Sequence, residues 1–166
     1  QEYARHSGEI LRMNLAIKKP NNDVSTLVFS NQVMAEFFSS SPSMEDMEEI
    51  QNFMMTPSYA DRIELEAEHV FAGDTYMREL RIPAGNLVFG KKHAKPHLLI
   101  LTEGHAHVVT EDGEFDSYAP TCFEGKNNSK RAVYAYTDCT FITIHPTKLT
   151  TVEEVEADAI QKEDLP

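Results

Sequence analysis

Two histidines, His93 and His97, lie four residues apart between two apolar runs, within the stretch from Gly85 to Gly104. Imidazole is the commonest metal ligand in proteins, so two histidines that face one interior form half of a metal site. Pro96 directly precedes His97 and argues against one continuous helix, because proline removes a backbone hydrogen bond and clashes with the preceding turn. The spacing therefore predicts a strand, a turn and a second strand, with one histidine on each side of the turn.

A metal at this pair needs at least one further ligand, and we predict a divalent transition metal (Zn, Fe, Mn or Ni) on His93, His97 and His145. His145 lies at the end of the last predicted strand. His69, at another strand end, and Glu103, in a turn where we expect it to face solvent, are the other candidates. The alternative is a pocket without metal, in which the first two histidines bind an anionic ligand or pair with each other.

Apolar and polar residues alternate from Ile63 onward, so we expect β-strands to carry these candidate ligands. Strand parity after Gly104 places Ala106 and Val108 inward, so His105 and His107 are predicted to lie at the surface. Many short strands at roughly ten-residue spacing, separated by Gly, Pro, Asn and Asp, are typical of a small antiparallel barrel or jelly roll. The predicted strands are residues 63–68, 76–82, 86–92, 97–102, 105–110, 115–118, 121–123, 131–136 and 140–145.

Two helices are predicted outside this β region. Ser43 is an N-cap for a helix over about 44–55, whose Met-rich face is either a packing surface or a partner-binding one. Thr151 and Glu154 form a capping box for a short C-terminal helix. We thus expect an N-terminal extension (1–60, with a strand at 25–29), a mainly β barrel (61–147) and a C-terminal helix and tail (148–166).

The stretch from Gly85 to Gly104 resembles the first motif of the cupins, G-x5-H-x-H-x3-E-x6-G. Both glycines and His93 match, whereas Lys91 stands at the first histidine position and His97 at the glutamate position. The preceding R-x-P-A-G turn, at residues 81–85, is also typical of cupins. In the stretch from 119 to 136, which resembles the second motif, Arg131 stands near the position of a further histidine. The G-K-x-H pattern, the later K-R-x-x-Y-A and the T-I-H-P at the last strand look like small cupin-like proteins encoded by phages and prophages.

This resemblance implies a jelly roll whose interior holds the metal ligands, and it implies a homodimer, since cupins commonly dimerise. Lys91 and Arg131 near one pocket favour a small anionic ligand, such as a carboxylate, a phosphate or an acidic sugar, because cations need a counter-charge beside a metal. The alternative for Lys91 is a side chain that points out of the barrel mouth. Two functions stay open: a metal-dependent enzyme of lyase, isomerase or oxygenase type, and a binding or phage assembly module.

Composition limits the classes of partner that we expect this protein to bind. The net charge of −12, from 15 basic and 27 acidic residues, disfavours nucleic acid and anionic membranes. Basic residues cluster around Lys91 and around Arg131, where they mark either the entrance for an anion or solvated turns. Neither a membrane-spanning run nor a secretory signal is visible, so we expect a cytoplasmic protein, in a host cell if phage-encoded, with virion association as the alternative. Cys122 and Cys139 are predicted to be buried free thiols.

Overall fold

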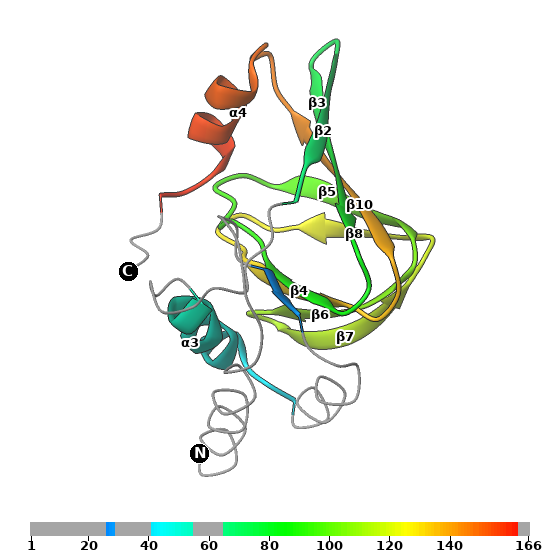
Figure 1. The fold of residues 1–166 in the computed structure, drawn as a ribbon. Helices are drawn as coiled ribbons and strands as arrows, with labels where there is room; N and C mark the ends of the chain where they lie inside the picture. Colours follow the sequence, from blue (N-terminus) through cyan, green and yellow to red (C-terminus); the bar gives the residue numbers. More distant parts are fainter. Residues whose placement is uncertain (1–25, 29–40, 55–64, 163–166) are drawn as a thin grey trace.

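The computed structural model describes residues 26–28, 41–54 and 65–162 (Figure 1). Within them the chain is mainly β, with two helices that lie outside the sheets. In chain order the elements are β1 (Thr26–Val28), α3 (Met44–Met54), β2 (Ala67–Ala72), β3 (Thr75–Ile82), β4 (Asn86–Phe89), β5 (His97–Glu103), β6 (His105–Thr110), β7 (Gly113–Tyr118), β8 (Thr121–Gly125), β9 (Arg131–Ala135), β10 (Cys139–Pro146) and α4 (Val152–Ala159).

The described strands form two antiparallel sheets, in the orders β1-β4-β9-β6-β7 and β2-β3-β10-β5-β8. After β3 the chain changes sheet at every connection between strands except the β6–β7 hairpin. This repeated crossing is what a jelly roll requires, and it confirms the predicted fold class. No strand pair in the described part of the chain hydrogen-bonds one sheet to the other, so the predicted barrel consists of two facing sheets.

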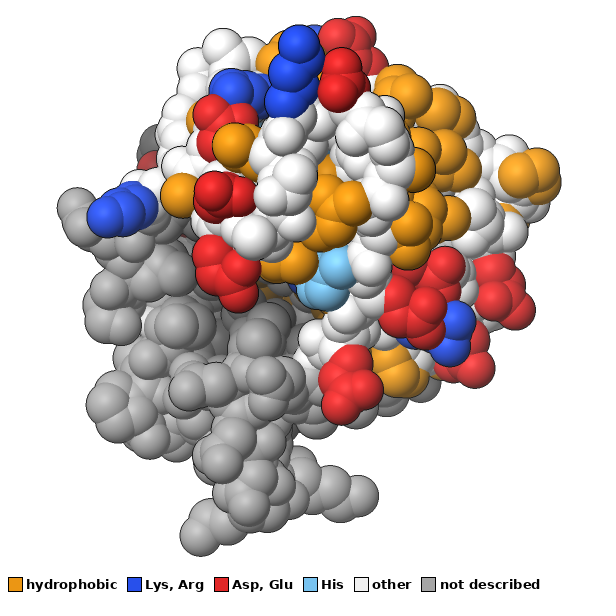
Figure 2. All heavy atoms as spheres, turned by 90° about the horizontal axis from the view of Figure 1, so that it is seen from above, with side chains coloured by type: hydrophobic (Ala, Val, Ile, Leu, Met, Phe, Trp, Pro, Cys, Tyr) orange, Lys and Arg blue, Asp and Glu red, His pale blue; other side chains and the backbone are white. Residues whose placement is uncertain are grey.

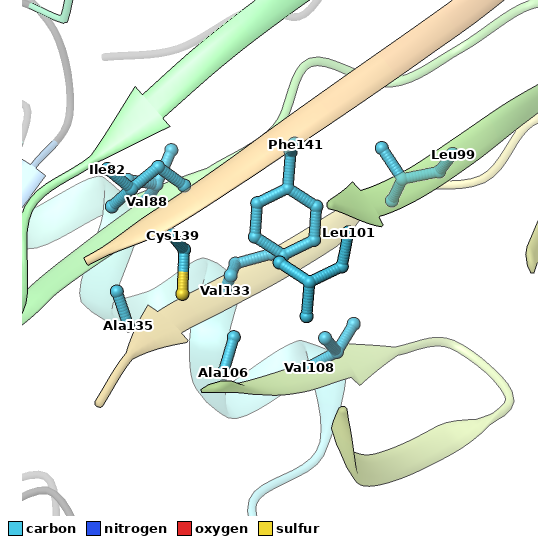
Figure 3. Packing of buried hydrophobic residues seen from close by; sticks show 10 residues of the cluster. All are labelled: Ile82, Val88, Leu99, Leu101, Ala106, Val108, Val133, Ala135, Cys139 and Phe141. Carbon is cyan, nitrogen blue, oxygen red and sulfur yellow. The ribbon is translucent and has the colours of Figure 1, made fainter. Parts of the chain in front are cut away.

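The space between the sheets is filled by side chains that alternate inward along each strand. Phe141 and Leu101 from one sheet meet Val133 and Val108 from the other (Figure 3). Gly104 allows the sharp passage from β5 to β6, because its φ is +92° and a Cβ there would lie 2.2 Å from the Asp138 carbonyl oxygen. The whole cluster consists of Ile82, Val88, Leu99, Leu101, Ala106, Val108, Val133, Ala135, Cys139 and Phe141.

Helix α3 contacts β6 and β9, strands of the first sheet. Its start is capped as predicted, since the Asp46 backbone N–H donates to Ser43 Oγ and the Asp46 carboxylate accepts from the Ser43 N–H at 2.7 Å. Its apolar face buries Met44, Met47 and Ile50. The Met-rich face is therefore a packing surface in this structure.

Helix α4 closes one end of the space between the sheets. Thr151 is its N-cap and accepts a hydrogen bond from the Glu154 N–H, which confirms the predicted helix start. Val155 and Ala159 pack against Tyr76 of β3. After the helix, the Gln161 N–H donates to the Lys92 carbonyl, so the chain end is joined to the loop between β4 and β5.

Three local predictions need correction. The strand predicted at 63–68 begins only at Ala67, where pairing with β3 begins, and residues 63 and 64 lie outside the described residues. The strand predicted at 86–92 ends at Phe89, because its partner strand β9 extends no further than Arg131. Cys139 is a buried free thiol as predicted, but Cys122 is exposed.

Strand β1, predicted at 25–29, is found at Thr26–Val28 and pairs with β4. No helix in the described residues is long and apolar enough to cross a membrane. The predicted division into 1–60, 61–147 and 148–166 stays a prediction.

We expect Met47→Ala to lower the free energy of unfolding by about 2–5 kcal/mol, because Met47 on α3 is fully buried and α3 contacts the first sheet. Chemical denaturation measures this loss. Met77→Ala is the matched control, since Met77 is only half-buried and should lose less. Equal, small losses for both variants would contradict the packing of α3 on the sheet.

Candidate functional site

Three separate segments bring His93, His97 and His145 together beneath α4. His93 lies in the loop between β4 and β5, where its backbone N–H donates to the Ser129 carbonyl at 2.9 Å. His97 is the first residue of β5, and His145 lies near the end of β10. Strands β5 and β10 are neighbours in one sheet, so the backbones of His97 and His145 lie close together.

The three imidazoles form one cluster, and the candidate ligand nitrogens all lie within 4.8 Å of one another. Ring centroids are 3.9 Å apart for His93 and His97, 4.9 Å for His97 and His145, and 5.2 Å for His93 and His145. The predicted pair thus faces one interior, and His145 joins it. His93 Nδ1 is buried without a hydrogen-bond partner, which leaves a lone pair or a proton for a ligand.

Hydrogen bonds at both ring nitrogens fix the orientation of His97. Its Nδ1 lies 3.1 Å from the Lys95 carbonyl oxygen, so Nδ1 carries the proton and Nε2 offers a lone pair. Arg131, the first residue of β9, donates a guanidinium N–H to that Nε2. The Arg131 residue is 9% exposed, and no carboxylate among the described residues forms an ion pair with its guanidinium. The Glu111 carboxylate, which accepts the Lys130 backbone N–H at 2.9 Å, acts on this guanidinium from further away and raises its pKa.

Burial controls the protonation of this cluster. Desolvation, with the neighbouring histidines and Arg131 adding to it, lowers the pKa of His93 to about 2 and the pKa of His145 to about 4. Burial and then Arg131 also lower the pKa of His97, while its hydrogen bond to the Lys95 carbonyl opposes them. Burial lowers the pKa of Arg131 to about 10. At neutral pH the three imidazoles are therefore neutral, and two guanidinium groups lie beside them, Arg131 and Arg78, which also lowers the pKa values of His93 and His145.

Gly125 on β8 makes room for the His97 ring, and sequence reasoning missed this role. Gly125 pairs with His97 across the sheet, and a Cβ at Gly125 would lie 2.1 Å from His97 Nε2. The available signal was a glycine at the end of a strand pattern, which often marks a close approach by another group.

A cavity of about 100 Å³ opens beside the cluster, between the sheets and under α4. His93, His145, Arg78 and Arg131 line one part of it, with Lys91, Thr143 and Glu156 nearby, and apolar side chains of the core line another part. Val155 and Ala159 of α4 form part of its cover. A volume of this size accommodates a few waters or one small ligand.

Lys91 lies at the rim of this cavity, and its ammonium is paired 3.1 Å from Glu156 of α4, with more than half of the side chain exposed. The ligand-binding roles predicted for Lys91 and Arg131 stay predictions. Figure 2 looks onto the α4 end of the molecule. Basic side chains lie there in separate places among more numerous acidic ones, so the described surface of this face carries no basic stripe.

The other candidate ligands lie elsewhere. His69 on β2 is exposed, and its Nδ1 lies 2.7 Å from the Tyr76 hydroxyl, outside the cluster. Glu103 is exposed, as predicted, and accepts from the Thr140 hydroxyl. Neither of them contributes to the cluster formed by the three histidines.

The prediction for His107 was wrong. Ala106 and Val108 do point inward, but His107 on the opposite face is 8% exposed. Its ring lies between Asp116, at 2.7 Å from Nδ1, and Glu114, at 2.8 Å from Nε2. The outer face of this sheet is covered, because α3 packs over β6 and β9, and parity alone does not reveal such a second layer. His105 is half-buried and stacks on Tyr118.

Comparisons with known proteins find likeness in fold. No family model and no curated protein matches the sequence. A cupin 2 domain-containing protein from Halorhodospira halophila is 15% identical, with a TM-score of 0.46 over 66% of this chain and 79% of that one. A cupin superfamily protein from Desulfitobacterium hafniense is 12% identical (TM-score 0.45, 54% and 83%). An RmlC-like cupin with a double-stranded β-helix fold from Methanocaldococcus jannaschii is 14% identical (TM-score 0.43, 52% and 84%).

All three are cupins. The neighbours in fold thus come from the family that the motif at Gly85–Gly104 resembles. At these identities the likeness concerns the fold alone, and it says nothing of a ligand, a metal or a reaction. For this chain, the question of ligand, metal and reaction rests on its own side chains.

We expect acid to destabilise the metal-free protein as the pH falls from about 6.5, the pKa of histidine in an unfolded chain, toward 4. The folded state keeps its cluster histidines neutral, so below pH 6.5 the unfolded state binds more protons. Each such histidine removes about 1.4 kcal/mol of stability per pH unit. Chemical denaturation at several pH values, with a chelator present, measures this slope.

His145→Gln should reduce the slope over this pH range. His69→Gln is the matched control, because His69 is exposed and lies outside the cluster. A wild-type stability that stays flat from pH 6.5 to 4.5 would contradict the burial of neutral imidazoles.

Proposed function

We propose that this chain is a small-molecule-binding protein whose cavity holds a divalent transition metal on His93, His97 and His145 and binds a small anion through Arg131. The observation that carries the proposal is the buried Arg131 guanidinium, which contacts a neutral imidazole and has no carboxylate partner in the described part of the chain.

The donor set fits a metal. Three imidazoles are a ligand set used for zinc, with positions left open for water or a ligand, and imidazole also suits iron and nickel. The lowered pKa values keep the nitrogens unprotonated, as ligation requires. The unpartnered His93 Nδ1 supports the same assignment. A metal bound here would supply a Lewis acid that polarises an oxygen of a bound anion.

Arg131 places a condition on that metal. Its guanidinium occupies the lone pair of His97 Nε2, so a metal ion at this nitrogen and the guanidinium compete for one position. A metal ion bound to His97 would lie close to the Arg131 guanidinium, and two cations side by side in a buried site repel strongly unless an anion lies between them. An anion that accepts the N–H groups of Arg131 would remove both the competition for His97 Nε2 and the repulsion between the cations. A guanidinium donates two parallel hydrogen bonds to a carboxylate or a phosphate.

Several expectations remain predictions. They include catalysis of lyase, isomerase or oxygenase type at the same cavity, a role in phage assembly, a homodimer and a cytoplasmic location. The absence of nucleic-acid and membrane partners is likewise a prediction from charge and composition.

Purified without chelators, the protein should contain about one equivalent of transition metal per chain, measured by elemental analysis. The double variant His93→Ala/His97→Ala should lose it, because one remaining imidazole cannot hold the ion against solvent. The matched control, His69→Ala/His105→Ala, removes two histidines outside the cluster and should keep the metal. Metal that is absent from the wild type, even after dialysis against Zn²⁺, would contradict this part of the proposal.

Arg131→Gln should weaken the binding of butanoate and of inorganic phosphate about ten-fold or more, as expected for a lost charge-assisted hydrogen bond. Isothermal titration measures both ligands. The same variant should fold with unchanged or higher thermal stability, since it removes a buried charge without a carboxylate partner. Arg81→Gln is the control, because Arg81 is exposed and paired with Glu68 and Glu79 outside the cavity. Equal affinities in wild type and Arg131→Gln would contradict the proposed role.

A further inference from the structure

The inward side chains change from apolar to polar along the strands that enclose the cavity. On β10 the inward positions are Cys139, Phe141, Thr143 and His145 in order. On β5 they are Leu101, Leu99 and His97, and on β9 they are Ala135, Val133 and Arg131. On β3 they are Ile82, Leu80, Arg78 and Tyr76.

The pairing register aligns these series. Phe141 lies opposite Leu80 on one side and Leu101 on the other, whereas His145 lies opposite Tyr76. The apolar ends therefore meet in one layer, deep between the sheets, and the polar ends meet in another, under α4 (Figure 3 shows the apolar layer). The cavity touches both layers, since its wall includes Phe141, Leu99 and Val133 as well as His145 and Arg131.

A ligand that fills this cavity must match both layers. Its charged group belongs beside Arg131, where a cation is already buried. The rest of the ligand then contacts hydrocarbon, where a hydroxyl or a second charge would be desolvated without a hydrogen-bond partner. Phosphate and acidic sugars have no apolar body to place there. The planar pair of N–H groups on the buried Arg131 guanidinium suits a carboxylate. Arg78 of β3 also lines the cavity, next to the polar layer, so a second cation lies on the same side as the charged group of the ligand.

We propose that the cavity selects short-chain monocarboxylates with an apolar body, whose carboxylate meets Arg131 and whose hydrocarbon part packs on Phe141, Leu99 and Val133. This inference rests on the proposed function and narrows its ligand class from small anions to amphiphilic carboxylates. The cavity of about 100 Å³ limits the length of the chain.

Titration of the purified protein with acetate, butanoate, hexanoate, gluconate and inorganic phosphate tests the ligand class. We expect binding to tighten about four-fold per added methylene from acetate upward, until the cavity is full. Gluconate has the same six carbons and charge as hexanoate but carries hydroxyls, so it should bind more weakly than butanoate.

Val133→Thr places a hydroxyl in the apolar wall at nearly constant volume. It should reduce the gain in affinity per methylene, since about 1 kcal/mol or more is lost where hydrocarbon meets the hydroxyl. Val108→Thr is the matched control: Val108 is buried in the same cluster but lies outside the cavity wall. If a variant fails to fold, the ligand series on the wild type decides alone.

The possible outcomes separate this inference from the proposed function. Affinity that is independent of chain length, or gluconate and phosphate that bind as tightly as hexanoate, would overturn the inference and leave an anion site at Arg131. If none of the five anions binds, both the inference and the proposed anion site are wrong. A chain-length dependence that Val133→Thr weakens and Val108→Thr preserves supports the inference.

Discussion

Burying a guanidinium costs free energy unless its charge meets a partner, and Arg131 is buried among imidazoles that are themselves neutral. The surrounding structure holds this arrangement in place: β9 fixes the arginine, the Lys95 carbonyl orients His97, and α4 covers the cavity. Burial lowers the pKa values of the same histidines and the cation adds to this effect, which keeps the imidazoles neutral. Under the proposed function, a site prepared in this way favours an anion and tolerates a metal only together with one.

The fold supplies this site through simple alternation. Because residues two apart on a strand face the same side, one polar residue at the end of each inward series is enough to build a polar layer above an apolar one. His97, Arg131 and His145 hold these terminal positions on β5, β9 and β10. Helix α4 then covers the layer: Val155 and Ala159 pack on Tyr76, and the Ala94 N–H donates to the Ala159 carbonyl. The exposed pairs Lys91–Glu156 and Lys95–Asp158 add little to this attachment.

Period-two patterning and turn residues predicted most strands within a residue or two, because alternation and Gly, Pro, Asn or Asp turns are local signals. The cluster of His93, His97 and His145 followed from the same patterning, since each stands at a strand end or beside a turn. Other features depend on contacts between segments distant in sequence. Burial of His107 requires α3 to cover the sheet, and the role of Gly125 requires the exact register of β5 and β8. The pairing of Lys91 with Glu156 requires α4 to fold back over the cavity.

The central claim is that one cavity joins the three histidines and Arg131 into a single ligand site. A crystal structure of the metal-loaded protein with butanoate, with anomalous scattering recorded at the metal absorption edge, tests it most directly. The account predicts an anomalous peak between the nitrogens of His93, His97 and His145, with the carboxylate on the Arg131 guanidinium. A peak elsewhere, or an Arg131 that still donates to His97 Nε2 with the metal and butanoate in excess, would contradict it.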